Sequence, residues 1–202
     1  MTTRRALLIV PTVSLALMTG CQDKEKHHDH DMHHADHHKM DAQAGATAVA
    51  NIQPSGITTT RPVMGKPTGT VSFKQEKDGK VKVTAEISGL PSNTTHGFHI
   101  HEKGDLSAPD LSSAGAHYNP EGHPHAGVET HDRHAGDLGN ITSDNEGNAR
   151  YEQTVDNISV GGSRNNVVGK SVIVHAKPDD LKSQPSGNAG DRIGGGVIEM
   201  KK

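Results

Sequence analysis

Six histidines and one aspartate between residues 99 and 175 could hold transition-metal ions. They are His99, His101, His117, His125, His134, Asp137 and His175. Imidazole nitrogens bind both copper and zinc, and a carboxylate oxygen is a further common ligand of zinc. The set is therefore large enough for one copper ion and one zinc ion.

The first two of these histidines are separated by a single residue. His99 and His101 alternate with the apolar Phe98 and Ile100. Because successive side chains of a β-strand point to opposite faces, a strand here would present both imidazoles on one face. That arrangement would allow the two side chains to bind one metal ion.

The segments that contain the candidate ligands occur in a characteristic order. They are FHIHE at 98–102, AHYNP at 116–120, RHAGDLGN at 133–140 and VIVHA at 172–176, followed by GNAGDR at 187–192. Together they resemble the copper-zinc superoxide dismutase family, and the resemblance covers most of residues 47–202. Several ordered motifs with closely similar spacing are much more specific than one His-x-His pair. The resemblance implies an enzyme, an oxidoreductase, with copper and zinc as its cofactors.

The resemblance also divides the candidate ligands between the two metals. The copper ligands that it implies are His99, His101, His117 and His175. The zinc ligands that it implies are His117, His125, His134 and Asp137. His117 would bridge the two ions through its opposite ring nitrogens, and the resemblance gives it a catalytic role in proton transfer.

Two further residues match functional positions of the family. Asp179 matches a carboxylate that links a copper-ligand histidine to a zinc-ligand histidine and orients both rings. Arg192 matches a catalytic arginine beside the copper channel, where its charge attracts and positions a small anion. The alternatives are an ordinary loop carboxylate and an ordinary surface arginine. His96, His123 and His131 do not match ligand positions, and we expect them to be structural or exposed to solvent.

The reaction implied by the resemblance is the conversion of superoxide to dioxygen and hydrogen peroxide, with copper alternating between Cu(II) and Cu(I). This activity would protect the cell envelope from oxidative damage. The alternative function is that of a non-catalytic periplasmic lipoprotein that binds or buffers copper and zinc. The sequence leaves open whether the chain forms a homodimer.

The N-terminal residues have the pattern of an export signal. Arg4 and Arg5 precede the apolar run 6–18, and Cys21 follows shortly after it. The pattern predicts a signal peptide over residues 1–20 and lipidation of Cys21, so we expect a lipid-anchored protein of the bacterial cell envelope that faces the periplasm. A membrane-spanning anchor is the alternative, but the run is shorter than the roughly 20 residues that a spanning helix needs.

A histidine-rich arm is expected over residues 21–46. From His27 to His38, seven of twelve residues are histidine. This composition cannot form a packed core, so we expect a flexible arm whose imidazoles and carboxylates bind divalent metals. A solvated spacer with no metal-binding role is the alternative.

The net charge and the cysteine content exclude two further properties, nonspecific nucleic-acid binding and an intramolecular disulfide. The formal net charge is −3 with neutral histidines, and it becomes −5 (19 minus 24) once residues 1–20 with Arg4 and Arg5 are removed, which argues against nonspecific binding to nucleic acid. Cys21 is the only cysteine, so an intramolecular disulfide cannot form. The disulfide usual in the family would align near Leu111 and Gly195, and its absence leaves the order of the loops open.

Residues 47–202 are expected to form one mostly β domain. Segment 80–87 alternates polar and apolar residues, and Asp78 and Gly79 favour a hairpin turn from a strand over 71–75. Further strand candidates are residues 98–101, 139–142, 149–155, 171–175 and 196–200. Loops rich in Gly, Pro, Asn and Asp separate them, and no long helical apolar stripe is present. These patterns predict an all-β sandwich or barrel, and the resemblance specifies an eight-stranded Greek-key β-barrel/sandwich with long metal-site loops.

Overall fold

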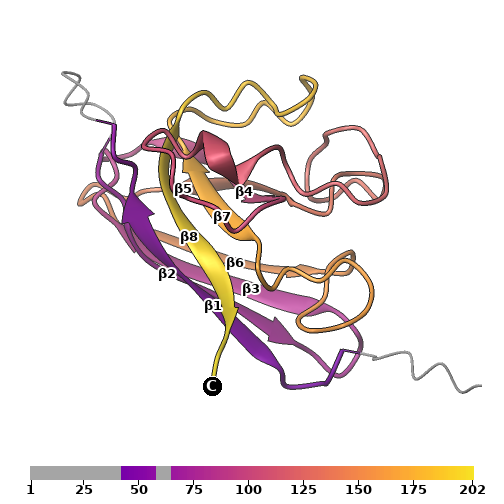
Figure 1. The fold of residues 1–202 in the computed structure, drawn as a ribbon. Helices are drawn as coiled ribbons and strands as arrows, with labels where there is room; N and C mark the ends of the chain where they lie inside the picture. The colour runs from indigo at the N-terminus through magenta and orange to yellow at the C-terminus, as the bar shows by residue number, and fades with distance from the viewer. Residues whose placement is uncertain (1–41, 58–64) are drawn as a thin grey trace, which may run out of the picture. The chain divides into compact units, whose positions relative to one another are not determined.

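Eight β-strands form the frame of this computed structural model, which describes residues 42–57 and 65–202 (Figure 1). In chain order they are β1 (Thr47–Pro54), β2 (Thr68–Gln75), β3 (Val81–Ser88), β4 (Thr95–His101), β5 (Asp137–Thr142), β6 (Ala149–Val155), β7 (Ser171–His175) and β8 (Arg192–Met200). A short 3-10 helix, η2 (Ser112–Ala114), lies between β4 and β5. Within the described ranges, no helix is long and apolar enough to cross a membrane.

The strands are antiparallel and follow the order β5-β4-β7-β8-β1-β2-β3-β6. The first three strands form a meander, but β6 pairs with β3 and β7 pairs with β4, so the chain crosses over twice between distant partners. Such crossovers produce Greek-key connectivity. The sheet curls into a nearly closed barrel (Figure 1), which confirms the predicted fold class.

Alternating burial builds the core, as β3 shows most clearly. Its buried residues are Val81, Val83, Ala85 and Ile87, and the residues between them are half-buried or exposed. Gly79 has a φ of 86° in the preceding turn, a left-handed conformation that glycine adopts without a steric penalty. The hairpin predicted from Asp78 and Gly79 therefore joins β2 to β3.

Strand β4 is buried on both faces, unlike β3. Phe98 and Ile100 belong to the barrel core, and His99 and His101 are equally inaccessible on the opposite face. Two long loops cover that second face: residues 102–136 before β5 and residues 176–191 before β8 (Figure 1). The alternation predicted for His99 and His101 thus directs both imidazoles into a buried site beneath these loops.

The structure adds to the predicted strands in two places. Strand β1 was not among the sequence candidates, because its buried positions are largely alanines with weak strand preference. Strand β8 starts at Arg192 rather than at residue 196. A Cβ at Gly196 would approach the Asn51 carbonyl oxygen to 2.5 Å, so glycine is needed for close pairing of β8 with β1.

The N-terminal predictions concern residues outside the described ranges. They are the signal peptide over 1–20, the lipidation of Cys21 and the histidine-rich segment of the arm. The described strands all belong to one compact unit, His38–Lys202.

Candidate metal centre

The seven candidate ligands lie together in two buried groups. One group contains His99, His101, His117 and His175, and the other contains His117, His125, His134 and Asp137. Within each group, one potential ligand atom from every residue lies within 4.8 Å of the others. His117 belongs to both groups, so the structure has the shared position that the sequence resemblance implied.

Strands and loops contribute to the centre together. Strand β4 supplies His99 and His101, and β7 ends at His175. An isolated antiparallel bridge pairs His101 with His117, which holds the long loop against the end of β4. The main chain reinforces this pairing, since the Tyr118 amide donates to the Ile100 carbonyl oxygen at 2.8 Å. Residues far apart in sequence are thereby fixed around one point.

Four histidine nitrogens in the centre are buried and have no hydrogen-bond partner. They are His99 Nδ1, His117 Nε2, His125 Nδ1 and His134 Nδ1, of which the last two lie close to Asp137 Oδ1 but without the geometry of a hydrogen bond. A buried polar atom without a partner is destabilising, whereas a metal ion would satisfy its lone pair. The donor types also suit copper and zinc, so the residues present fit both metals.

We call the first group the copper side and the second group the zinc side, after the metals that the resemblance implies for them. On the copper side, main-chain oxygens orient His101 and His175. His101 Nδ1 lies 2.9 Å from the Gly115 carbonyl oxygen, and His175 Nδ1 lies 3.1 Å from that of Gly190. Each carbonyl accepts the ring proton, which leaves Nε2 as the lone-pair nitrogen. The Nε2 atoms of His101 and His175 then face each other at 3.3 Å. Two lone pairs at that distance suit a shared cation better than a mutual hydrogen bond.

Asp137 gathers the zinc-side histidines. Its Oδ1 atom lies 2.9 Å from His117 Nδ1, 3.0 Å from His125 Nδ1 and 3.2 Å from His134 Nδ1. Its Oδ2 atom accepts main-chain hydrogen bonds from Ala126 and His134, each at 3.1 Å. Burial would raise the pKa of Asp137, but its histidine partners hold that pKa well below the usual range. The group therefore supplies one carboxylate and three imidazole nitrogens.

Asp179 links the two groups, as the sequence resemblance implied. Its Oδ2 atom accepts from His99 Nε2 at 2.8 Å, and its Oδ1 atom accepts from His125 Nε2 at 2.9 Å. Asn140 fixes the main chain of Asp179 in turn, since its side-chain amide accepts from the Asp179 amide nitrogen at 2.7 Å and donates to the Asp179 carbonyl oxygen at 2.9 Å. Asp179 thereby orients one ring on each side of the centre.

Burial sets the protonation of the copper-side rings. It lowers the pKa of His99, His101 and His175, and it lowers the pKa of His117 to about 4. For His125, burial would also lower the pKa, but Asp137 and Asp179 outweigh it and raise the pKa to about 9. Metal binding requires a neutral imidazole, so the copper-side rings are already in the binding form at neutral pH.

Arg192 lies beside the centre without belonging to either group. Its Nη1 atom donates to the Leu111 carbonyl oxygen at 2.5 Å, and its Nη2 atom donates to that of Gly115 at 2.6 Å. Together with His101, His117 and His175 it lines a cavity of about 530 Å³. A guanidinium has no lone pair for a metal but can attract an anion into this cavity.

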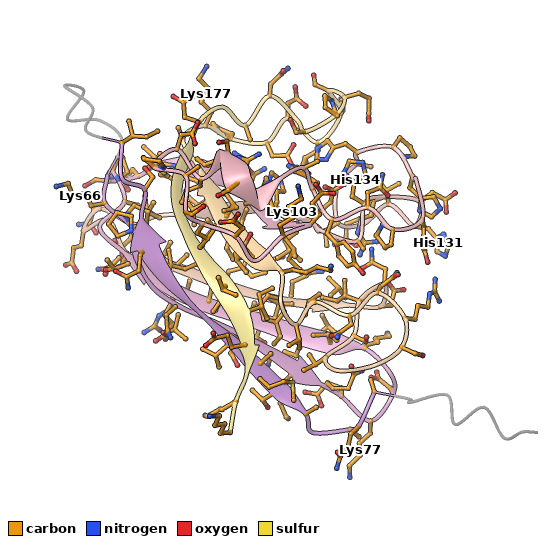
Figure 2. All side chains as sticks on the ribbon, viewed as in Figure 1. Lys66, Lys77, Lys103, His131, His134 and Lys177 are labelled. Atoms are coloured by element: carbon orange, nitrogen blue, oxygen red, sulfur yellow. The ribbon has the colours of Figure 1, made fainter. Side chains whose placement is uncertain are left out.

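The three histidines expected to lie outside the ligand sets occupy other positions. His96 is buried beneath the site, where its Nδ1 donates to the His175 carbonyl oxygen at 2.8 Å. His123 Nδ1 lies 3.3 Å from the Arg133 carbonyl oxygen. His131 pairs with Asp132 and is exposed, at the outer tip of the loop that carries His134 (Figure 2). Both metal groups found among the described residues exclude these three side chains.

Several residues that position the site were not identified from the sequence. Leu111 and Gly115 hold Arg192 through their carbonyl oxygens, and no pattern of side chains in the sequence reveals such main-chain contacts. Gln184 bonds the main chain of His125 from a distant loop. For Asn140 the sequence did offer a signal. It lies in the RHAGDLGN motif, three residues after Asp137, and this position could have identified it as part of the site.

Comparison with known proteins points to one family. The family model described as copper/zinc superoxide dismutase (SODC) matches residues 67–198. A Cu-Zn superoxide dismutase of Paramecium bursaria Chlorella virus 1 is 43% identical over 160 residues, which cover 73% of this chain and 84% of that relative. The crystal structure of the clock protein EA4 aligns with a TM-score of 0.66 and 35% identity, covering 79% of this chain and 97% of the other.

Proposed function

Since the chain belongs to the copper/zinc superoxide dismutase family, we propose that its superoxide dismutase activity depends on redox cycling of a copper ion held by the four-histidine group. The observation that carries this proposal is the position of His117. Its Nε2 is unpartnered and belongs on the copper side, whereas its Nδ1 lies 2.9 Å from Asp137 on the zinc side. One imidazole can therefore serve both ions.

The assignment of residues to the two metals is the one that the family resemblance implies, and the two groups of potential ligand atoms support it. His99, His101, His117 and His175 would hold copper, and His117, His125, His134 and Asp137 would hold zinc. When bound, copper supplies one-electron chemistry by alternating between Cu(II) and Cu(I), while zinc polarises the shared imidazole. Overall, two superoxide ions and two protons give dioxygen and hydrogen peroxide.

The protein's own residues attract superoxide, orient the metal ligands and hold a proton for the product. Arg192 draws the superoxide anion into the cavity, where its two carbonyl partners hold the guanidinium in one orientation. Asp179 keeps the His99 and His125 rings aligned. His117 lines the same cavity, and its Nε2 can hold a proton for the peroxide product. The two long loops limit the approach of larger molecules.

Selective metal removal tests the copper assignment. Protein that contains zinc but no copper should lose superoxide turnover, and copper alone should restore it. Cu(II) electron paramagnetic resonance should show nitrogen ligands, and His101→Ala should change that spectrum while a zinc-site probe is unaffected. Full turnover in protein shown by elemental analysis to be copper-free would refute the assignment.

We also propose that the protein protects the cell envelope as a lipid-anchored protein facing the periplasm. The support is the sequence around Cys21, which has the pattern of a lipoprotein cleavage site. A radiolabelled fatty acid should be incorporated into the wild-type chain and not into Cys21→Ser, and the wild-type protein should fractionate with membranes. An unlabelled wild-type chain would refute the anchor.

The histidine-rich arm supports an auxiliary role in metal binding. It carries seven histidines in twelve residues from His27 to His38, which suit weak binding of additional copper or zinc. Deletion of residues 22–41, which spares the main-chain bonds of Gly45 and Ala46 to Gln75, should remove this extra metal and leave turnover per bound copper unchanged. A loss of turnover at matched copper occupancy would show that the arm contributes to catalysis.

A further inference from the structure

The main-chain amide and carbonyl oxygen of His125 need hydrogen-bond partners that no neighbouring strand provides. His125 is 2% exposed and lies in the long loop before β5, outside any strand. Buried main-chain groups need hydrogen-bond partners. Within the described ranges, neither its amide nor its carbonyl oxygen bonds another main-chain group. A side chain must therefore satisfy both.

Gln184 satisfies both groups from the other long loop. The His125 amide donates to Gln184 Oε1 at 2.8 Å, and Gln184 Nε2 donates to the His125 carbonyl oxygen at 2.8 Å. The two bonds close a ring that resembles pairing between adjacent strands. One primary amide thus fixes the position and orientation of the His125 backbone.

The same device occurs twice more around this centre. The side-chain amide of Asn140 bonds both main-chain groups of Asp179, and the amide of Asn119 bonds both main-chain groups of His123, at 3.0 and 2.8 Å. Irregular loops have no strand partners, and these amides replace them. Asp179 and His125 are also bonded to each other, so the clamps on the two residues reinforce one another.

With the main chain and Nε2 of His125 fixed, Nδ1 is the only ring nitrogen left to bind a metal. Gln184 holds the main chain, and Asp179 holds Nε2. The unpartnered Nδ1 then lies 3.0 Å from Asp137 Oδ1, where the zinc ligands gather. The copper-side ligands His101 and His175 are oriented by other carbonyls, so loss of Gln184 would act directly on the zinc side and reach the copper side only through Asp179 and His99.

We propose that Gln184 is a positioning residue for zinc, which retains the metal by clamping the main chain of His125. This inference rests on the proposed assignment of His125 to zinc. It also connects the two loops, because Pro185 and Ser186, directly after Gln184, line the cavity with Arg192. Zinc retention and the shape of the cavity rim therefore depend on the same side chain.

Two substitutions in the copper-zinc enzyme test the clamp. Gln184→Met keeps the side-chain length but removes both polar atoms. Gln184→Glu keeps the acceptor for the His125 amide but places a second oxygen against the His125 carbonyl. Gln53→Met in β1 is the matched control, since Gln53 is exposed and none of the hydrogen bonds found for the described residues involves its side chain.

The measurement is the rate of zinc release to a chelator, with copper release followed in the same samples. We expect Gln184→Met to release zinc about tenfold faster, which corresponds to about 1.4 kcal/mol. Gln184→Glu should release it at least as fast, Gln53→Met should match the wild type, and copper release should change by less than about twofold. Co(II) placed in the zinc site should show an altered d–d spectrum in both Gln184 variants.

Wild-type zinc release from Gln184→Met would overturn the proposal, and so would equal acceleration of copper and zinc release, which indicates general loosening. If Gln184→Met does not fold, Gln184→Glu decides the question by the same comparison. His125→Ala separates this proposal from the site assignment. If that variant kept the wild-type Co(II) spectrum, the zinc assignment itself would be wrong, whatever Gln184 does.

Discussion

Truncation of Leu111 should weaken both the fold and the reaction. Its side chain is 6% exposed and packs with Ala114 and Ile173 in a small cluster outside the main core. Its carbonyl oxygen accepts a hydrogen bond from Arg192. A Cβ added at Gly195 would lie 3.3 Å from Leu111 Cδ1, so the two positions near which the family's disulfide would align are in contact. Apolar packing therefore secures the loop that orients Arg192.

The expected loss of stability follows from this burial. Leu→Ala substitutions in cores cost about 2–5 kcal/mol, with the lower values where the surroundings can collapse. The Leu111 cluster is small and borders a loop, so we expect about 2.5 kcal/mol for Leu111→Ala. In a domain of this size, that change lowers the melting temperature by about 5–10 °C. The superoxide rate should also fall severalfold, because Arg192 would be less well oriented.

Leu90→Ala provides the matched control. Leu90 is also 6% exposed, but it packs in the main core. Urea unfolding of metal-free protein measures the loss of stability, and pulse radiolysis at equal metal occupancy measures the rate. Both variants should be destabilised, but only Leu111→Ala should lose rate. Equal rates in the two variants would refute the link between Leu111 and Arg192, and unchanged stability in Leu111→Ala would refute the packing argument.

Three further predictions concern charge, metal and pH. Arg192→Leu should lower the second-order rate with superoxide and weaken its dependence on ionic strength, at unchanged copper and zinc content. Unchanged kinetics would exclude steering by Arg192. Metal-free protein should melt well below the copper-zinc form, because metals bound to the native state stabilise it and no disulfide is present; calorimetry that gave coincident melting curves would contradict this. The metal-free protein should also lose stability as the pH falls below 6.5. The lowered pKa values of His99, His101 and His175 mean that the unfolded chain binds more protons there, and urea titrations between pH 7 and 5 measure the slope. His125 contributes the opposite dependence only at higher pH, since its raised pKa gives stability that is present below 6.5 and is lost as the pH rises through about 9.

The strands were predictable where burial alternates along the sequence. In β3, valines and isoleucine alternate with polar residues, and the expected strand and hairpin are present. In β1 the buried positions include Ala48 and Ala50, whose small side chains give a weak alternation signal. In β8 the run Gly194 to Gly196 is typical of a loop, yet its lack of side chains is what permits close strand pairing.

The grouping of the candidate ligands could be anticipated from motif order, because each ligand lies in a short recognisable segment. The residues that hold those ligands in place could not. The Gly115 carbonyl oxygen accepts from both His101 and Arg192, and this convergence exists only after the loop has folded. Gln184 lies 59 residues from His125, and a lone glutamine in a polar loop carries no signal for such a contact.

Pulse radiolysis of protein with measured copper and zinc occupancy tests the proposed chemistry most directly. Superoxide decay and the visible absorption of Cu(II) would be followed together. We expect decay to be catalytic and proportional to bound copper, with bleaching and recovery of the Cu(II) band as the ion is reduced and reoxidised. Protein that contains zinc alone should show neither effect. Fully copper-loaded protein that left superoxide to decay at its spontaneous rate, with a static Cu(II) band, would contradict the proposed redox mechanism.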